Sequence, residues 1–254
     1  MSQKIKNKNN VHQKVDSPPI VSFAQLGQVP YLQAYQLQKE LLTLRQQQQI
    51  PDIILLLEHP ATLTIGKSGT ESNILLDQTE LKHQAVTVYT TDRGGDVTGH
   101  NPGQLVVYPI LDLHCYFRDV PRYISLLEES IIRTIAVFGL TGHRKKRFPG
   151  VWVEQEKIAA IGVRLSRWVT MHGFALNVNN DLSIFKSIHP CGIENCAITS
   201  IRHQLGRTVP MKVVIKEFRL CFETCFGVQL HPLSAHNAPD YTPSLARLVQ
   251  PDPE

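Results

Sequence analysis

The chain has 254 residues, 42% of them hydrophobic and 19% charged, and a formal net charge of +4 at pH 7. This composition is typical of a folded globular protein and excludes a disordered or fibrous chain. The longest purely aliphatic run, Ile53–Leu57, is far shorter than the ~20 apolar residues of a membrane-spanning helix, so no such span is predicted.

The positive charge is concentrated in two places. Four lysines against Asp16 give residues 1–20 a charge of +3, and the cluster Arg144–Arg147 contributes +4. The remainder of the chain is therefore net acidic and offers no broad basic face. The charge pattern argues against nucleic-acid binding.

The chain contains five cysteines, an odd number, without a CxxC pair. Its start, MSQKIKNKNN, lacks the apolar segment of a secretory signal. A disulfide framework is therefore not expected, and the predicted location is the reducing cytoplasm. An organellar transit peptide is the alternative that these residues leave open.

The two ends of the chain are predicted to lie outside the folded part. Residues 1–20 carry too few apolar side chains to offset the conformational entropy lost on ordering. Residues 232–254 contain five prolines and are predicted to be disordered as well. We expect a single domain over residues 21–231.

Within this domain, apolar spacing of three or four positions predicts helices, and short runs rich in β-branched residues predict strands. In chain order we expect a helix at 34–44, strands at 53–57, 62–65, 86–90 and 105–110, a helix at 124–138, strands at 151–153, 158–163, 168–172 and 175–178, and a helix at 214–225. Because the strands come in clusters and do not alternate with helices, the pattern favours an α+β fold with a mixed, largely antiparallel sheet flanked by helices.

A polar, glycine-rich segment precedes the strand at 105–110. Residues 93–104 read RGGDVTGHNPGQ, with four glycines that permit close backbone approach or positive φ. The segment matches neither a phosphate-binding P-loop nor a dinucleotide-binding turn. It is either a ligand-contacting loop or a long hairpin connection.

Two further segments suggest chemistry. In KIAAIGVR at 157–164, Lys157 leads an apolar strand, either as an inward-pointing base or as the exposed end of a strand. In HPCGI at 189–193, a proline and a glycine flank Cys191, so a turn can present this thiol as a nucleophile. The candidate bases for Cys191 are Lys157, His100, His172 and His189.

The other cysteines suit other roles. Cys221 and Cys225 lie on the apolar face of the helix at 214–225, where a thiol usually acts as a small core side chain. The eleven histidines form no metal-binding spacing with the cysteines, and no metal site is predicted.

Taken together, RGGDVTGHNPGQ at 93–104, KIAAIGVR at 157–164, HGFALNV at 172–178 and PCGI at 190–193 resemble the octanoyltransferases of lipoic acid synthesis. The sequence PGVWV at 149–153 and the pair Thr199-Ser200 also resemble that family. The similarity spans about residues 21–230. It implies the α+β fold of the biotin and lipoate ligases, and residues 21–231 would be the catalytic acyltransferase domain.

The resemblance also implies a reaction and partners. An octanoyl group would move from its thioester on acyl carrier protein to a lysine of a lipoyl domain, as found in 2-oxoacid dehydrogenases and the glycine cleavage H protein. Cys191 would be the nucleophile, and Lys157 would lower the pKa of Cys191 and accept its proton. No cofactor is implied, because a thioester arrives already activated. The substrate-binding residues that the resemblance implies are Arg93, Gly94, Gly95, Asp96, Val97, Thr98, Gly99, His100, Ala160, Ile161, Gly162, Gly173, Phe174 and Ala175.

Departures from the family pattern and rival functions remain. Gly99, Asn101 and His189 stand where relatives commonly have an aromatic residue, a glycine and an apolar residue, which affects the expected acyl chain length. The rivals are a ligase of the same fold that uses ATP, a non-catalytic binding protein and a thiol hydrolase. The cluster Arg144–Arg147 is either a docking site for an acidic carrier protein or a solvated turn.

Overall fold

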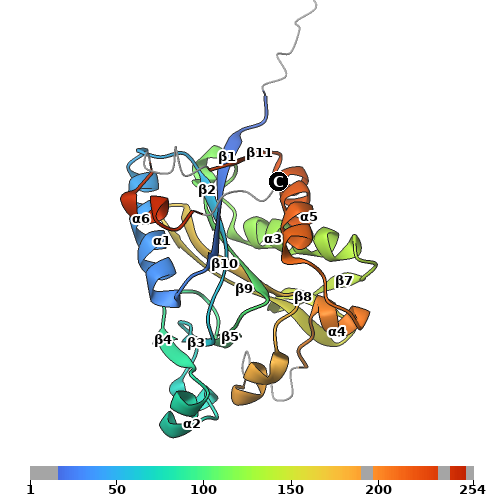
Figure 1. The fold of residues 1–254 in the computed structure, drawn as a ribbon. Coiled ribbons are helices and arrows are strands. Elements are labelled where there is room, and N and C mark those ends of the chain that lie inside the picture. The colour runs from blue at the N-terminus through green and yellow to red at the C-terminus, as the bar shows by residue number, and fades with distance from the viewer. Residues whose placement is uncertain (1–16, 190–196, 234–240, 250–254) are drawn as a thin grey trace, which may run out of the picture.

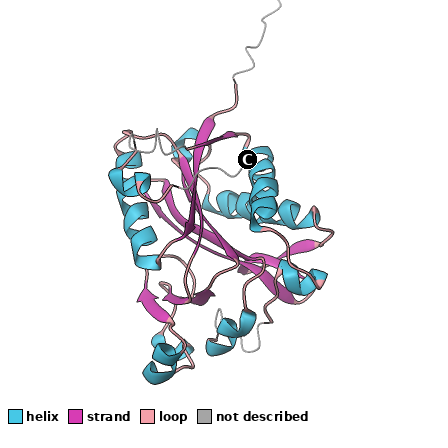
Figure 2. Ribbon diagram, in the orientation of Figure 1, coloured by secondary structure: helices cyan, strands magenta, loops and turns pink. Residues whose placement is uncertain are grey.

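The computed structural model describes residues 17–189, 197–233 and 241–249. Within these ranges no helix is long and apolar enough to cross a membrane. The elements form two sheets with helices packed around them (Figure 1, Figure 2).

The larger sheet has eight strands in the order β11-β1-β2-β6-β10-β9-β8-β7. β1 runs parallel to both of its neighbours, and every other neighbouring pair in this sheet is antiparallel. The predicted mixed, largely antiparallel sheet is therefore confirmed. The strands are β1 (Ile20–Gln28), β2 (Ile53–Glu58), β6 (Gln104–Ile110), β7 (Gly142–Lys145), β8 (Phe148–Val153), β9 (Glu156–Ser166), β10 (Val169–Asn177) and β11 (Gln229–Pro232).

The smaller sheet lies at one end of the larger one and has the order β4-β3-β5 (Figure 1). It consists of β3 (Thr62–Ile65), β4 (Thr87–Thr90) and β5 (Val97–His100). β5 is formed by the second half of the segment RGGDVTGH, so the glycine-rich loop at 93–96 leads directly into this sheet. The 3-10 helix η3 (Leu182–Ser187) packs Ile184 and Phe185 on the same small core.

Helices cover both faces of the larger sheet. α3 (Val120–Ala136) and α5 (Met211–Phe226) lie on one face, and α1 (Tyr31–Gln46) lies on the other (Figure 1). The remaining helices are α2 (Gln78–His83), α4 (Ile201–Leu205) and α6 (Pro243–Ala246), with the 3-10 helices η1 (Glu71–Asn73) and η2 (Leu113–Cys115).

The three predicted helices are confirmed as α1, α3 and α5. α3 begins as expected, because Asp119 accepts a hydrogen bond from the backbone N–H of Arg122 at 2.9 Å and a proline occupies the first turn. α5 ends at Gly227, whose φ of 67° is left-handed and suits glycine. The predicted placement of Cys221 and Cys225 in the core is wrong, since both are half-buried and Phe222 occupies the buried face instead.

The strand predictions need two corrections. The expected strands 168–172 and 175–178 are one strand, β10, because Gly173 continues it. A Cβ at Gly173 would lie 2.2 Å from the carbonyl oxygen of Val107, so glycine permits close strand approach there. The strands β1, β5, β7 and β11 were not predicted.

The C-terminal stretch is not a structureless tail throughout. Tyr241 donates from its hydroxyl to Ser22 Oγ at 2.6 Å, and the Thr242 hydroxyl donates to Glu40. Leu245 in α6 is fully buried against the α1 face of the sheet. Residues 241–249 therefore belong to the folded part, because these apolar and hydroxyl side chains find partners on α1 and β1.

Candidate active site

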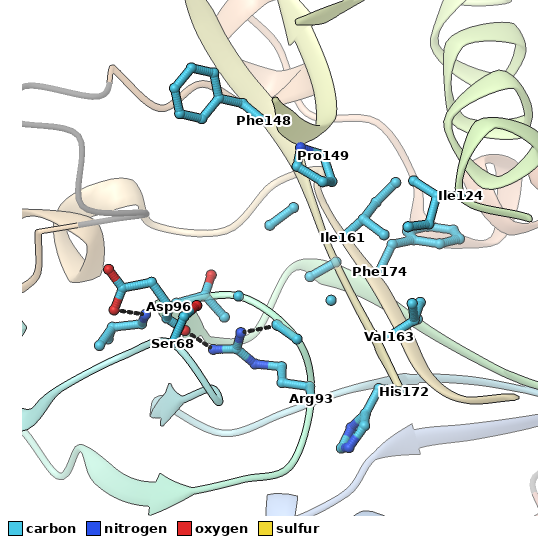
Figure 3. A pocket seen from close by; sticks show the side chains of 18 of the residues that line it. Ser68, Arg93, Asp96, Ile124, Phe148, Pro149, Ile161, Val163, His172 and Phe174 are labelled. Carbon is cyan, nitrogen blue, oxygen red and sulfur yellow. Dashed lines mark hydrogen bonds between the residues drawn. The ribbon is translucent and has the colours of Figure 1, made fainter. Parts of the chain in front are cut away.

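A cavity of about 400 Å³ opens beside β9 and β10 (Figure 3). Its walls come from the loop 93–98, from β9, β10 and the β7–β8 turn, and from single residues on α1 and α3. Thirteen of the fourteen predicted substrate-binding residues line it, and the exception is Gly99, which faces Ile184 and Leu63. The sequence-predicted segments therefore meet around one space.

The cavity exists because β9 loses one partner strand along its length. β8 pairs with β9 only as far as Ala160, and beyond that β10 is the one strand paired with β9 among the described residues. The loop at 93–95 crosses this free edge, with the Gly94 N–H donating to the carbonyl oxygen of Val163 at 3.0 Å. A Cβ at Gly162 would lie 2.7 Å from the carbonyl oxygen of Gly94, so a larger residue would push the loop away.

Arg93, one of the predicted substrate-binding residues, also holds the loop that lines the cavity. Its Nη2 donates to the Thr64 carbonyl oxygen at 2.6 Å and to the Asp96 carbonyl oxygen at 2.7 Å, and its Nη1 donates to the Gly94 carbonyl oxygen at 3.0 Å (Figure 3). The side chain is buried and lies against the cavity at the same time. We conclude that Arg93 holds the loop in its shape and fastens it to β3.

Lys157 lies inside the protein, with 5% of its surface exposed, and lines the cavity. The interpretation of Lys157 as an exposed strand end is therefore wrong. Its Nζ lies 5.5 Å from the centroid of the Trp152 ring. A Cβ at Gly150 would lie 2.7 Å from Lys157 Cε, so the glycine gives the lysine stem its room.

Glu128 on α3 supports the strand beside Lys157. Its carboxylate accepts a hydrogen bond from the Gly150 N–H at 3.0 Å and another from Arg144 Nε at 3.1 Å. Gly150 has a φ of +133°, a conformation that other residues rarely adopt. The carboxylate thus fixes this backbone conformation of β8 beside the lysine.

The predicted nucleophile, Cys191, lies outside the described residues. The segment that precedes it ends at His189, whose N–H donates to the Asn73 carbonyl oxygen at 2.8 Å. The segment that follows it begins at Ala197, whose carbonyl oxygen accepts from the Lys157 N–H at 2.8 Å. Thr199 also donates to the Lys157 carbonyl oxygen at 3.0 Å, so the chain resumes directly beside the lysine.

Two of the candidate histidine bases are engaged elsewhere. His100 Nδ1 lies 2.8 Å from Gln104 Oε1, and His172 Nε2 lies 2.7 Å from Asp92 Oδ1. Burial lowers the pKa of His100 to about 3 and also lowers the pKa of His172, although the hydrogen bond with Asp92 opposes the second shift. Both rings are neutral at pH 7, and the third histidine candidate, His189, is exposed.

A third buried histidine and three tyrosines complete this end of the site. His59 Nδ1 lies 2.6 Å from the Val29 carbonyl oxygen and Nε2 lies 2.8 Å from the Tyr108 hydroxyl. Burial lowers the pKa of His59 to about 4. The rings of Tyr31, Tyr35 and Tyr108 stack on or meet those of the histidines at centroid distances of 5.3–6.2 Å.

Several lining residues were not predicted from sequence. Most of them come from elements distant in the chain from the predicted segments, although Pro149, Val163 and His172 lie within PGVWV, KIAAIGVR and HGFALNV. These residues are Tyr31, Ser68, Tyr108, Ile124, Arg147, Phe148, Pro149, Val163 and His172. His172 carries one signal, since it opens the segment HGFALNV, and it was predicted only as a candidate base.

The basic cluster Arg144–Arg147 is divided by the structure. Arg144 pairs with Glu128 and with Glu129, the latter at 2.7 Å, and Lys145 Nζ lies 4.0 Å from the centroid of the Trp152 ring. Arg147 is exposed at the cavity, next to Phe148. Within the described residues no group of three or more His, Cys, Asp or Glu side chains is placed to hold a metal ion.

Comparison with known proteins identifies relatives along most of the chain. Residues 30–223 match the model of the lipoyl protein ligase A/B catalytic domain. An octanoyltransferase from Desulforamulus reducens is 45% identical over 207 residues, which cover 81% of this chain and 91% of the relative. An octanoyltransferase from Rubrobacter xylanophilus is 46% identical over 203 residues, which cover 79% of this chain and 91% of the relative.

Solved structures agree on the fold at low sequence identity. A putative lipoate protein ligase from T. acidophilum with bound lipoic acid superposes with a TM-score of 0.69 at 13% identity, covering 91% of this chain and 93% of that chain. A lipoate-protein ligase A bound with ATP has a TM-score of 0.67 at 11% identity, with the same coverage of 91% and 93%. The predicted lipoate-ligase-like fold is confirmed. Since nearly half of the aligned residues are identical over most of its length, the chain belongs to the octanoyltransferases, acyltransferases of the lipoyl protein ligase A/B catalytic domain family.

Proposed function

We propose that this octanoyltransferase takes the octanoyl group from its thioester on acyl carrier protein and delivers it to a lysine of a lipoyl domain by way of a thioester on Cys191. The observation that supports this proposal most strongly is the setting of Lys157. A buried lysine lines the cavity, and its backbone pairs with Ala197 and Thr199, shortly after Cys191 in the chain.

In the first half of the reaction, the Cys191 thiol gives its proton to the Lys157 amine and attacks the carbonyl carbon of the donor thioester. This attack forms a carbon–sulfur bond to Cys191, and the carbon–sulfur bond to the carrier then breaks, which leaves the octanoyl group on Cys191. The carrier leaves as a thiolate and takes the proton back from Lys157. A free thiol is only a few per cent thiolate at neutral pH, so a nearby proton acceptor increases the reactive fraction.

In the second half, the amine of the lipoyl-domain lysine attacks the acyl-enzyme carbonyl. An amide bond forms, the bond to Cys191 breaks, and the proton lost by the attacking amine passes through Lys157 to the departing thiolate. The enzyme returns to its starting state without ATP or a metal ion, because the donor thioester supplies the free energy.

The acyl chain would lie in the cavity described above. Apolar side chains of Ile161, Val163 and Phe174 line it, together with Gly162 and Gly173, which expose backbone (Figure 3). We expect the backbone N–H groups of the loop 93–98 or of Gly192 to stabilise the oxyanion, as such donors do in acyl transfer. Acceptors would be lipoyl domains of 2-oxoacid dehydrogenases or the glycine cleavage H protein.

We place this reaction in the cytoplasm, as the cysteine pattern predicts. In the described part of the chain Cys115, Cys221 and Cys225 are free thiols, which a reducing compartment preserves.

The test is acyl transfer without ATP. The protein is incubated with octanoyl-acyl carrier protein, its intact mass is measured, and a lipoyl domain is then added. We expect an octanoyl adduct that Cys191→Ala abolishes and that passes to the lipoyl domain. Cys115→Ala is the matched control, because Cys115 is an exposed free thiol on η2 that does not line the cavity.

The outcomes separate the rival functions. An adduct that is hydrolysed and never transferred would indicate a thiol hydrolase, and transfer of free octanoate only with ATP would indicate a ligase. A folded protein that gives neither adduct nor transfer would contradict the proposal and favour a binding protein.

A further inference from the structure

The segment that follows β3 wraps around the glycine-rich loop of the cavity. The Gly66 N–H donates to the Asp96 carbonyl oxygen at 3.1 Å, the Lys67 N–H to the Arg93 carbonyl oxygen at 3.0 Å, and the Ser68 N–H to the Gly95 carbonyl oxygen at 3.1 Å. This segment ends in η1, whose last residue is Asn73. Residues 66–73 therefore form an outer layer against one wall of the cavity.

The side chain of Asn73 grips that wall through Asp96. Asn73 Nδ2 lies 2.8 Å from Asp96 Oδ1 and 2.9 Å from Asp96 Oδ2. Asp96 Oδ1 also accepts from the Val97 N–H at 2.7 Å. A Cβ at Gly69 would lie 2.7 Å from the same oxygen, so the carboxylate packs closely over the glycine.

The backbone around Asn73 is hydrogen-bonded to a second part of the site, the segment 187–189. The Asn73 carbonyl oxygen accepts from the His189 N–H at 2.8 Å, and the Leu75 N–H donates to the Ser187 carbonyl oxygen at 2.8 Å. Ile74 and Ile188 form an antiparallel bridge between these two bonds. The end of the described segment 187–189 is thus fixed to η1.

We propose that Asn73 is a positioning residue of the octanoyl-transfer site, because it joins the loop 93–98 to the segment 187–189. The proposal rests on the proposed function, in which both pieces flank the reacting thioester. Asn73 contacts the first piece with its side chain and the second with its backbone, so a shift of one is transmitted to the other.

We call the contacts of Asn73 with Asp96 and with His189 the clasp. The loop needs such a clasp because of its composition. Gly94 and Gly95 are adjacent, and Gly95 has a φ of +90°, so the loop has wide conformational freedom when it is unsupported. The bond from Asn73 to an ionised carboxylate is a charge-assisted hydrogen bond, which is stronger than a neutral one. It therefore favours one conformation of the loop.

The test is a side-chain exchange across the clasp. Asn73→Asp places two carboxylates within hydrogen-bond distance, whereas Asn73→Asp combined with Asp96→Asn restores an amide facing a carboxylate in the reverse order. Residues in contact typically show couplings of ~2- to ~100-fold, and we expect Asn73→Asp to slow single-turnover acylation at least ~10-fold, with the double variant faster than Asn73→Asp.

Controls separate positioning from folding. Asp77→Ala removes the side-chain cap of the adjacent α2 and should leave the acylation rate unchanged, although it loosens the same part of the chain. If Asn73→Asp fails to fold, Asn73→Ser removes the amide without adding charge and should still slow acylation. Thermal unfolding midpoints establish which variants are folded.

The results distinguish the clasp from the proposed function. A wild type that transfers octanoyl groups, with Asn73→Asp and Asn73→Ser at the wild-type rate or a double variant no faster than Asn73→Asp, would overturn the clasp alone. A wild type that forms no Cys191 adduct would overturn the proposed function before the clasp is tested.

Discussion

Two regions of the molecule, the core under α3 and α5 and the walls of the cavity, are held in different ways. In the α3–α5 core, fully buried rings and aliphatic chains such as Tyr123, Leu127 and Phe222 fill the space between helices and strands. At the cavity, polar side chains such as Arg93 and Asn73 fasten the walls. An empty space cannot be maintained by close packing, which would fill it, so directional hydrogen bonds keep the walls apart.

This contrast predicts that changes in the α3–α5 core and changes at the cavity have different consequences. A substitution among the packed rings should reduce the free energy of unfolding and leave the activity of the folded molecules unchanged. A substitution at the cavity should reduce the activity of the folded molecules and leave the free energy of unfolding unchanged. Four predictions examine this contrast, and they are ordered by the size of the effect.

The largest effect is expected at Lys157. Lys157→Ala should lower the rate of enzyme acylation by ~10²- to ~10⁴-fold, the usual contribution of a general acid–base group. Lys157→Arg should be nearly as slow, because arginine keeps the charge but does not release a proton at neutral pH. Single-turnover mass spectrometry with octanoyl-acyl carrier protein measures both rates. An arginine variant with wild-type activity would assign the lysine an electrostatic role only.

The next effect is on stability. Phe222→Ala should reduce the free energy of unfolding by ~3 to ~5 kcal/mol, because it removes a fully buried ring and leaves a cavity between Phe218 and Phe226. Urea denaturation measures the loss, and acylation at low temperature, where the variant is folded, should be unchanged. A matching loss of acylation per folded molecule would contradict the contrast between the core and the cavity.

The buried histidines predict acid sensitivity. The pKa values of His59 and His100 are lowered to about 4 and about 3, so between those values and the ordinary value of ~6.5 the unfolded chain binds protons that the folded chain does not. Stability should therefore fall as the pH decreases below ~6.5, by ~1.4 kcal/mol per pH unit for each histidine. His100→Gln should make this slope shallower. Urea denaturation between pH 4.5 and 7 measures the slope, because about two pH units of this range lie below ~6.5. The exposed His83→Gln serves as the control, and equal slopes in both variants would contradict the assignment.

The smallest effect concerns the basic cluster. Arg147→Glu should raise the KM for acyl carrier protein several-fold and weaken its salt dependence, because Arg147 is exposed at the cavity and rim charges act mainly on association. Arg144→Glu should instead act on stability, since Arg144 pairs with Glu128 and Glu129. Steady-state kinetics at two ionic strengths separate the two variants. Equal KM values for Arg147→Glu and the wild type would favour a solvated turn.

The sequence predicted the elements whose side chains repeat regularly and missed those that depend on distant partners. α3 was recognisable from its apolar spacing, its Asp119 cap and Pro121. β1 was missed because Ser22, Gln25 and the bulge at Gly27 interrupt its apolar pattern, and its strand structure is stabilised by pairing with β2 and β11. β10 was divided in two because a glycine within a strand looks like a break until Val107 is seen to lie against it.

For the site, short motifs indicated where the cavity walls lie in the chain but not how each residue acts. The motif around Arg93 predicted a substrate contact, and only the positions of Thr64 and Asp96 show that the guanidinium holds the loop. Tyr31 and Tyr108 lie on α1 and β6, far from any motif, and reach the cavity through the tertiary fold. Asn73 carries no sequence signal, since its role depends on two segments that meet at it in space.

The arrangement at the edge of the large sheet also has a consequence for how the chain is made. β1, near the start, pairs in parallel with β11, and residues 241–249, near the end, pack against α1 and β1. During synthesis β1 and the apolar face of α1 therefore stay partly uncovered until some 200 later residues have left the ribosome. Contacts between residues so far apart in the chain form slowly. An uncovered strand edge is prone to pair with other chains. β11 and residues 241–249 thus cover β1 and α1 last. Nascent chains that end before β11 should therefore be the form most dependent on chaperones.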